Sequence, residues 1–363
     1  MLDIYKYNKS ASPSIHDVIQ ATLQWHFSEE TGSPFWLKKR ISLPFDPLHD
    51  IKTLQDLDEF PDYTEEMKRI PVDQLIPKGL HTLNWGFEVF ESGGTTGSPQ
   101  KIVDMYSRKK ALEWVFQELN DQSIFENCSG HWLHVGPTGP HIVGRSIGRM
   151  ATYLSKLCYY IDFDPRWVKK CSKNGEFDVV KAYIQHLLEQ VSTVLETQNI
   201  EVLFATPALL EAMSKNEKLS SLIQKKIKVI IWAGTSIDEG TLDALETFIF
   251  PEARLIGLYG NTLMGIAPQR QKFKDDPKAC VFQTLHPFSI VQLVDKENHR
   301  ELTPYNTYGQ VKLTLFSPEL FIPSRLERDQ ALRVAPVGSY TWDGVADVKP
   351  MENVKEKIFE GVY

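Results

Sequence analysis

Short apolar segments alternate with amphipathic segments from His131 to Tyr259, and this alternation constrains the fold more than any other feature of the chain. The apolar segments predict strands at 131–135, 158–161, 202–205, 228–232 and 254–259. Apolar residues at helical spacing and helix-start signals predict helices at about 109–120, 142–157, 178–195, 208–213 and 238–250. Strands that alternate with helices form a mostly parallel sheet flanked by helices, with ligands bound where the strands end. The sequence therefore predicts an α/β fold.

The regions on either side of this alternation have a different character. Residues 1–80 mix aromatic and polar side chains between prolines, so we expect helices and loops packed on the core. Residues 81–285 form the expected α/β core. Residues 286–363 are expected to form a β-rich subdomain and a truncated hinge, with antiparallel strands at 290–294 and 310–316.

Composition excludes several classes of protein. The 363 residues are 42% hydrophobic and 24% charged, as in globular proteins. A net charge of -7 argues against a nucleic-acid binder. The four cysteines show no Cys-x-x-Cys spacing, the N-terminus lacks an export signal, and no apolar stretch is long enough to span a membrane. We therefore expect a cytoplasmic protein with neither a nucleic-acid nor a membrane partner.

A segment rich in glycine and hydroxyl residues precedes the alternation, with the sequence Ser92-Gly93-Gly94-Thr95-Thr96-Gly97-Ser98-Pro99-Gln100. Glycines allow the backbone to approach a ligand closely, and hydroxyls donate hydrogen bonds to anionic oxygens. Apolar residues at 87–90 and 102–103 predict two short strands joined by this loop. No Gly-Lys-Ser/Thr occurs, which excludes the P-loop of nucleotide triphosphatases. On composition alone, a phosphate-binding loop and an ordinary hairpin turn both fit.

Two of the expected strands end in small or polar residues. One ends in Trp232-Ala233-Gly234-Thr235, and the other in Tyr259-Gly260-Asn261-Thr262-Leu263-Met264-Gly265. Both ends lie at the carboxyl edge of the predicted sheet, where open α/β folds bind ligands. Each also has a structural explanation, as a tight turn at Gly234 and as a core aromatic at Tyr259.

Taken in order, these three segments resemble motifs of the adenylate-forming superfamily, which comprises acyl- and aryl-CoA ligases, luciferases and adenylation domains. Residues 92–99 resemble the Ser/Thr-Ser/Gly-Gly-Thr-Thr-Gly-x-Pro-Lys signature, 233–234 the Gly-Gly-Glu-type adenine loop, and 259–262 the Tyr-Gly-x-Thr-Glu motif. The chain is most similar to the phenylacetate-CoA ligase-like branch. It departs at Gln100, where most members carry lysine, and at Leu263, where a glutamate usually helps to hold magnesium. The resemblance implies the large N-terminal domain of such an enzyme.

The resemblance also implies roles for individual residues. The catalytic residues would be Thr95, Thr96 and Thr262, with Thr262 bonded to the adenylate phosphate. Nucleotide binding would involve Ser92, Gly93, Gly94, Gly97, Ala233, Gly234, Thr235, Tyr259, Gly260, Asn261 and Asp329. The implied cofactors are ATP and Mg²⁺, with CoA as one candidate acceptor, and the metal ligands stay undetermined.

The pocket for the acid is expected to be lined by His134, Gly136, His141, Trp232 and Gly265. Glycines at a strand end suit a planar acyl group, and a histidine there could contact its carboxylate. A metal site built from the neighbouring histidines is disfavoured, because His131 and His134 point to opposite faces of a strand.

The expected function is ATP-dependent activation of a small carboxylic acid, aryl or compact acyl, as an acyl-adenylate. The acyl group would then pass to CoA, to an acyl carrier protein thiol or to an amine. In the family a small C-terminal domain supplies a catalytic lysine, and too few residues follow Lys349 to form one. Two alternatives therefore stay open. One is a subunit that binds an acyl group or nucleotide and is either non-catalytic or completed by a partner that supplies the small domain. The other is an acyltransferase that uses pre-activated acyl groups, with Cys280 as a candidate acceptor.

Overall fold

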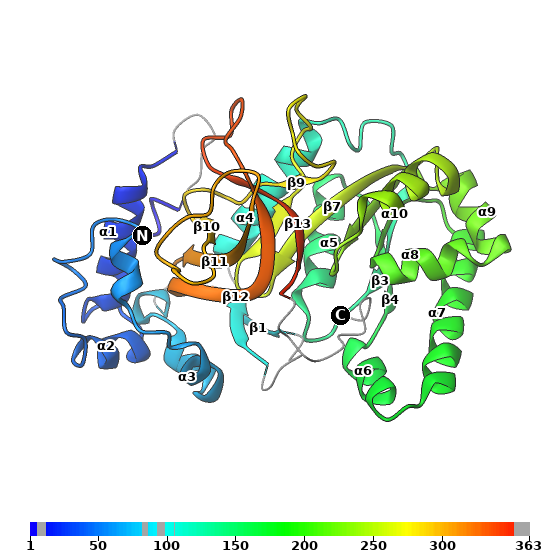
Figure 1. Ribbon diagram of the computed structural model, residues 1–363. Helices are drawn as coiled ribbons and strands as arrows, with labels where there is room; N and C mark the ends of the chain where they lie inside the picture. The colour runs from blue at the N-terminus through cyan, green and yellow to red at the C-terminus, as the bar shows by residue number, and fades with distance from the viewer. Residues whose placement is uncertain (6–11, 82–85, 93–98, 105, 352–363) are drawn as a thin grey trace. The chain divides into compact units, whose positions relative to one another are not determined.

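The computed structural model describes residues 1–5, 12–81, 86–92, 99–104 and 106–351 (Figure 1). The chain divides into two compact units. Unit 1 contains residues 1–114, 261–266 and 283–351, and the described part of unit 2 contains residues 115–260 and 267–282. The helix α4 (Tyr106–Asn120) contributes its first residues to unit 1 and its last residues to unit 2.

Unit 2 is built on a six-stranded sheet with the strand order β4-β3-β5-β6-β7-β8. The strands are β3 (His131–Gly136), β4 (Cys158–Asp162), β5 (Ile200–Ala205), β6 (Val229–Ala233), β7 (Arg254–Asn261) and β8 (Gly265–Pro268), and the turn from β7 to β8 belongs to unit 1. The neighbours from β4 to β7 pair in parallel, as predicted. Every residue of β5 is buried, which explains why this strand reads as a continuous apolar run. A short strand, β9 (Val281–Phe282), bridges to Gln269.

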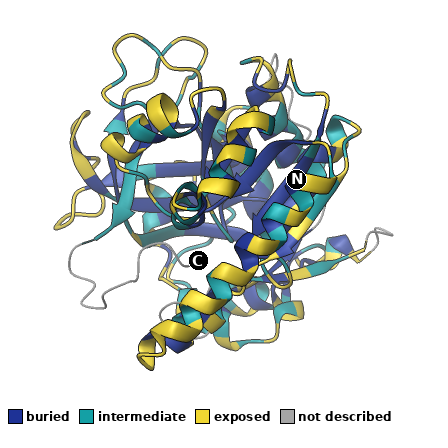
Figure 2. Cartoon of the chain, turned by 90° about the vertical axis from the view of Figure 1, so that its right-hand side faces the viewer, coloured by how far each residue is buried: buried dark blue, intermediate teal, exposed yellow. Residues whose placement is uncertain are grey.

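Helices flank this sheet, and in Figure 2 the exposed residues, in yellow, lie mainly on helices and loops, whereas several strands are dark blue. They are α5 (Ile142–Tyr153), α6 (Pro165–Lys173), α7 (Phe177–Thr197), α8 (Pro207–Ser214), α9 (Glu217–Lys226) and α10 (Glu239–Ala244), which continues as a π-turn at Leu245–Ile249. The sequence reading missed α6 and α9, although Asp164 and Asn216 cap their first turns. None of the described helices combines the length and apolarity needed to cross a bilayer.

The helices α7 and α8 start without a capping hydrogen bond from the N-cap side chain. The N-cap of α7 is Glu176, and Asp178 lies in the first turn, where a carboxylate interacts favourably with the helix dipole. Thr206 occupies the N-cap of α8 with Pro207 at the first helical position, but its hydroxyl makes no capping bond. The proline and the backbone hydrogen bond from Leu210 N to Thr206 O define that start instead.

Unit 1 contains the predicted antiparallel region. The strands β10 (Ser289–Val294), β11 (Tyr308–Phe316), β12 (Phe321–Val334) and β13 (Gly344–Pro350) follow one another in the sheet, and each pairs antiparallel with the next. The 14-residue β12 was not predicted, because its centre contains the charged run 325–329. A separate hairpin of β1 (Glu88–Glu91) and β2 (Lys101–Asp104) confirms the two short strands expected around the glycine-rich loop.

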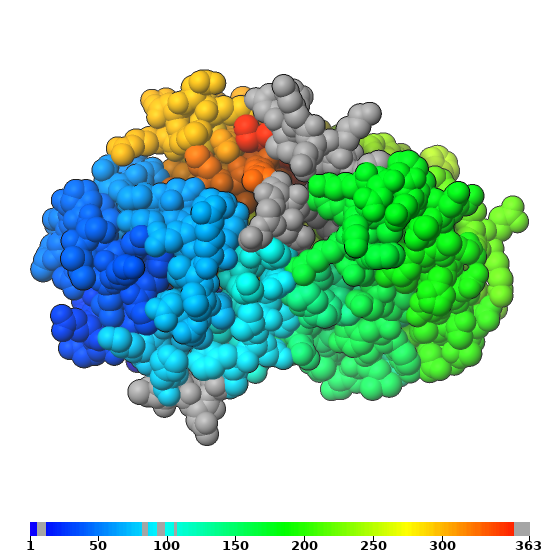
Figure 3. Space-filling model, turned by 90° about the horizontal axis from the view of Figure 1, so that it is seen from below, coloured from blue at the N-terminus to red at the C-terminus, as the bar shows by residue number. Residues whose placement is uncertain are grey.

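The N-terminal residues of unit 1 pack on β12. They form α1 (Ile15–Phe27), α2 (Pro34–Arg40), α3 (Thr64–Arg69) and 3-10 turns at Asp56–Glu59, Val72–Leu75 and Lys78–Leu80. Figure 3 shows the N-terminal residues of the chain, in blue, as one continuous surface. Phe27, Trp36 and Phe60 surround Phe321 with ring centroids 6.1, 5.3 and 5.8 Å away. This aromatic cluster supplies the apolar contact between the first 80 residues and the antiparallel sheet.

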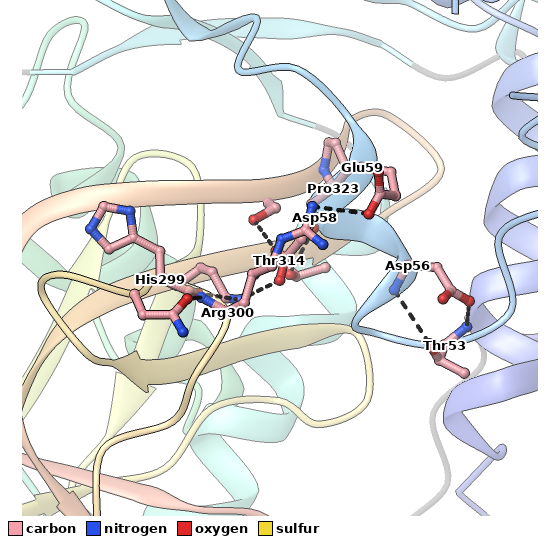
Figure 4. Close-up of polar contacts among 11 residues, drawn as sticks. Thr53, Asp56, Asp58, Glu59, His299, Arg300, Thr314 and Pro323 are labelled. Carbon is pink, nitrogen blue, oxygen red and sulfur yellow. Dashed lines mark hydrogen bonds and ion pairs between the residues drawn. The ribbon is translucent and has the colours of Figure 1, made fainter. Parts of the chain in front are cut away.

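A buried ion pair joins the same two parts of unit 1 (Figure 4). Nζ of Lys312 on β11 lies 2.9 and 3.1 Å from the carboxylate oxygens of Asp58 and donates to the carbonyl of His299 at 3.1 Å. The Ser324 hydroxyl also donates to Asp58, at 2.8 Å. The side chains of Lys312 and Asp58 are 5% and 11% exposed. The adjacent pair between Glu59 and Arg300 is mostly exposed.

Candidate functional site

The neck of the glycine-rich loop is a closed hairpin in unit 1. Ser92 N donates to the carbonyl of Gln100, and Gln100 N donates to the Ser92 hydroxyl, both at 2.9 Å. The side chain of Gln100 is 3% exposed and donates to the carbonyl of Lys101. Gln100 therefore braces the neck from the interior. The residues expected at the loop itself lie outside the described residues, namely Gly93, Gly94, Thr95, Thr96 and Gly97.

The two strand ends of unit 2 that were singled out are neighbours. In the parallel register Ala233 pairs with Leu258, so Gly234 and Tyr259 follow at the ends of adjacent strands. Gly234 has φ of 99°, a conformation that glycine adopts without strain. A Cβ at this position would find only the Thr206 methyl, at 3.5 Å. Backbone conformation, rather than crowding, therefore calls for glycine here, and it leaves Gly234 and Thr235 in an open bend after β6.

An aromatic cluster lies behind these residues. The ring of Trp232 is 4% exposed and meets Phe282 edge-on at 6.2 Å, and Tyr259 lies 6.0 Å from Phe282. A Cβ on Gly257 would lie 2.7 Å from Cζ2 of Trp232, so glycine at this position lets the indole pack closely against β7. The Trp232 indole N–H has no hydrogen-bond partner among the described residues. The cluster gives this edge of the sheet an aromatic, apolar lining.

His134, the histidine that was expected to line the acid pocket, lies near the end of β3 and is buried inside the protein. His134 is fully buried, its ring stacks on Phe204 at 4.6 Å, and its Nε2 lies 3.2 Å from the carbonyl of Pro137. Burial lowers the pKa of His134 to about 4, so the ring is neutral at pH 7. Gly136 is buried against both rings, and His141 is the N-cap residue of α5. His134 therefore supports the loop from Gly136 to His141 and carries no charge for a carboxylate.

The turn from β7 to β8 carries Thr262 and is tightly bonded within unit 1. The Asn261 side-chain oxygen accepts hydrogen bonds from Leu263 N at 3.0 Å and from Met264 N at 2.8 Å. Thr262 is half-buried, whereas Leu263 is 4% exposed and points into the protein. Gly260, the residue before Asn261 on β7, is exposed. Asn261 thus fixes the backbone on which the Thr262 hydroxyl is displayed.

Asp329 lies on β12, where its backbone pairs with Pro350 of β13. The residue is half-buried, and burial raises the pKa of its carboxyl above the usual range. No hydrogen bond or ion pair to this carboxylate occurs within the described part of the chain. A partly desolvated carboxylate with open lone pairs is suited to accept hydroxyl hydrogen bonds from a ligand.

Comparison with known proteins identifies the fold. No protein-family model matches this chain, and no curated protein sequence matches it. An open conformation of 2-hydroxyisobutyryl-CoA ligase, solved with 2-HIB-AMP and CoA, is 12% identical with a TM-score of 0.61, covering 94% of this chain and 79% of that one. The same ligase in the thioesterification state is 13% identical with a TM-score of 0.60, covering 95% and 73%.

The chain has the fold of an acyl-CoA ligase. The predicted combination of a helix-flanked parallel sheet with a smaller antiparallel sheet is confirmed. Membership of the adenylate-forming superfamily and of its phenylacetate-CoA ligase-like branch stays a prediction. An ATP-bound RpMatB-BxBclM chimera also matches, at 13% identity and a TM-score of 0.47 over 71% of this chain, and this chain spans 46% of its length.

The described residues contain no cluster of side chains that could form a metal site. No cluster of three or more His, Cys, Asp or Glu side chains among them could hold a metal ion. Leu263 offers an apolar side chain at the position where the resemblance expects a glutamate.

Cys280, the candidate acyl acceptor, has the wrong chemistry for a nucleophile. Its thiol lies 3.3 Å from the side-chain oxygen of Gln269, and burial raises its pKa to about 12. Because the thiolate is the nucleophilic form, a thiol with this pKa is unreactive at neutral pH. The geometry gives no support to an acyltransferase that uses Cys280.

Sequence reasoning missed two residues that shape these segments. Gly257 makes room for Trp232, and a glycine inside an apolar strand is a signal for close approach that could have been used. Arg108 on α4 donates to the carbonyls of Thr262 and Leu263. A lone arginine in an amphipathic helix gives no such signal, because the carbonyls that it meets can belong to any residue type.

Proposed function

We propose that this protein uses MgATP to activate a carboxylic acid, aryl or compact acyl, as an acyl-adenylate, and then transfers the acyl group to a thiol or amine. The observation that carries this proposal is the register of β6 and β7. It brings the two strand ends that resemble the adenine loop and the Tyr-Gly-x-Thr-Glu motif to neighbouring positions at the carboxyl edge of the parallel sheet. In α/β sheets this edge is where nucleotides bind.

The residues suit the parts of an adenylate. Gly234 has no side chain above its bend, so an adenine ring can approach the backbone of Ala233 and Gly234, and Tyr259 offers an aromatic ring for stacking. The hydroxyls of Ser92, Thr95, Thr96 and Thr262 are donors for phosphate oxygens. Asp329 can accept the two ribose hydroxyls. The aromatic Trp232 and the small Gly136 suit a compact or planar acyl group.

The proposed chemistry is in-line substitution at phosphorus. A carboxylate oxygen of the acid attacks the α-phosphorus of ATP, a P–O bond forms, and the bond to pyrophosphate breaks. The hydroxyl of Thr262 and the backbone N–H groups of the glycine-rich loop stabilise the charge that develops on the phosphate oxygens. The acceptor thiol or amine then attacks the acyl carbon and releases AMP. CoA is the acceptor named by the 2-hydroxyisobutyryl-CoA ligase structures, and a carrier-protein thiol is the other candidate.

A second function, binding of an acyl-adenylate or nucleotide without its formation, is favoured by two departures from the family motifs. Leu263 is buried and cannot bind magnesium, and Gln100 is buried and donates its side-chain hydrogen bond to the carbonyl of Lys101. A partner would then complete the reaction.

The deciding experiment is pyrophosphate release by the purified protein with MgATP and a panel of aryl and short acyl acids. Acid-dependent release supports adenylation and identifies the class of acid. Binding of ATP without release for any acid contradicts adenylation by this chain and supports the binding subunit. Absence of both contradicts both proposals.

The variant Asp329→Asn is expected to weaken ATP binding and, at the same time, to make the folded protein more stable. Loss of the charged acceptor weakens ATP binding at least about tenfold, since a hydrogen bond to a charged group contributes about 1.5–3 kcal/mol. The same change raises Tm at pH 7.5, by about 2–4 °C for each 1 kcal/mol gained. The reason is that burial raises the pKa of this carboxyl, so ionisation at neutral pH disfavours the folded state.

The pH dependence of the gain in stability provides a control for this prediction. A raised pKa in the folded state costs stability as the pH rises through that pKa, so the gain in Asp329→Asn must shrink as the pH is lowered through it. Calorimetry with ATP and thermal unfolding at several pH values measure the two effects. Unchanged ATP affinity would contradict the ribose role.

A further inference from the structure

The carbonyl groups of the β7–β8 turn are bonded to a side chain from a distant part of unit 1. Nη2 of Arg108 lies 3.1 Å from the Thr262 carbonyl and 3.4 Å from the Leu263 carbonyl. Arg108 is on the first turn of α4, and its side chain is 14% exposed. The Asn261 side chain holds the N–H groups of the same turn. Two sets of hydrogen bonds therefore hold the main chain around Thr262. Its N–H groups donate to the Asn261 side chain, and its carbonyl groups accept from Arg108.

Gly265 makes room for this guanidinium. A Cβ on Gly265 would lie 3.2 Å from Nη1 of Arg108, and the residue has φ of 90°. Both features call for glycine at this position. The structure thus gives Gly265, which was expected in the acid pocket, a role in admitting Arg108 to the turn.

Asp104 ties the guanidinium to the glycine-rich hairpin. It is the last residue of β2, the strand that follows the loop, and its side chain is fully buried. Its carboxylate lies 3.6 Å from Nε of Arg108. A guanidinium can contact a carboxylate through Nε while its terminal nitrogen reaches carbonyls, whereas a lysine ammonium offers a single point charge. Arg108 therefore connects the strand behind the glycine-rich loop to the turn that carries Thr262.

We propose that Arg108 is a positioning residue for Thr262, with Asp104 as its counter-ion. The expected effect on the reaction rate rests on the proposed adenylation reaction. The positioning of the turn by Arg108 does not depend on that reaction. Arg108 contacts the main chain of Thr262, so it acts through the position of the Thr262 hydroxyl. A group that acts on the phosphate only in the transition state affects kcat more than the KM for ATP.

Arg108→Gln is expected to lower kcat for pyrophosphate release by about 10- to 100-fold, since a misplacement of about 1 Å can cost that much. The KM for ATP should change by less than about twofold. Arg108→Lys should recover only part of the rate, because a lysine cannot reproduce both contacts. In the Thr262→Ala background, Arg108→Gln should have almost no further effect, because a residue that acts only through Thr262 is not additive with it. Lys110→Gln, on the same helix, is the matched control.

Hydrogen exchange of residues 261–265 provides a readout that does not depend on activity. The amides of Leu263 and Met264 donate to Asn261, so loss of the Arg108 clamp should speed their exchange at least about tenfold relative to Lys110→Gln. If Arg108→Gln leaves the hydrogen exchange of residues 261–265 unchanged, the proposal is overturned. It is also overturned if the effects of Arg108→Gln and Thr262→Ala on kcat are additive in the double variant. If Arg108→Gln fails to fold, Asp104→Asn, which removes only the counter-ion charge, must speed exchange in the same segment. If the unaltered protein releases no pyrophosphate with any acid, the adenylation proposal fails, and hydrogen exchange alone still decides whether Arg108 positions the turn.

Discussion

Thr262→Ala is expected to lower kcat for acid-dependent pyrophosphate release by about 10²–10³-fold, the loss typical when one donor to a developing charge is removed. Thr262 lies in a turn whose backbone is fixed by Asn261 and Arg108, so the hydroxyl can be removed without moving the chain. The residue is half-buried and contributes little to the core, so the free energy of unfolding should change by less than about 1 kcal/mol.

Two further variants complete this test. Thr262→Ser keeps a hydroxyl on the same backbone and should retain most of the activity. Thr247→Ala removes an exposed hydroxyl from the π-turn after α10 and should leave the rate unchanged. A normal rate for Thr262→Ala, or an equal loss in Thr262→Ser, would show that the hydroxyl does not act on the phosphate.

The parallel part of the fold could be predicted because its strands are buried on both faces. The run from Ile200 to Ala205 is buried at every position, and such a strand is apolar throughout. The opposite holds for β12, whose residues from Ser324 to Asp329 are partly exposed and mostly charged. Its long-range pairing with β11 and β13 stabilises it, and no local pattern reports such pairing.

The candidate site divides in the same way. Gly234 and Tyr259 could be placed at one sheet edge from sequence, because the carboxyl ends of parallel strands share an edge. The inward orientation of the His134 side chain could not be predicted from sequence, since its burial depends on Phe204 from the next strand and on the carbonyl of Pro137. Arg108 was hidden for the related reason that its partners are main-chain carbonyls.

Asp58→Ala is expected to lower the free energy of unfolding by about 3–5 kcal/mol, the range for removing one partner of a buried ion pair. Lys312 is 5% exposed and has two oxygen partners, the Asp58 carboxylate and the His299 carbonyl, so the variant leaves a buried ammonium with one neutral acceptor. The Ser324 hydroxyl loses its acceptor as well. Urea unfolding monitored by tryptophan fluorescence measures the loss, and Trp36 lies in the aromatic cluster that joins the same two parts of unit 1.

The neighbouring pair in Figure 4 is a matched control, because Glu59 and Arg300 are 53% and 65% exposed and Glu59→Ala should therefore cost no more than about 1 kcal/mol. The double variant Asp58→Ala with Lys312→Met separates two explanations. If the cost comes from the stranded charge, replacing the lysine by an apolar side chain of similar length recovers most of the stability. If the pair itself holds the N-terminal residues to the sheet, the double variant stays as unstable as Asp58→Ala. We expect the recovery, because Phe27, Trp36 and Phe60 still pack on Phe321 when both charges are gone.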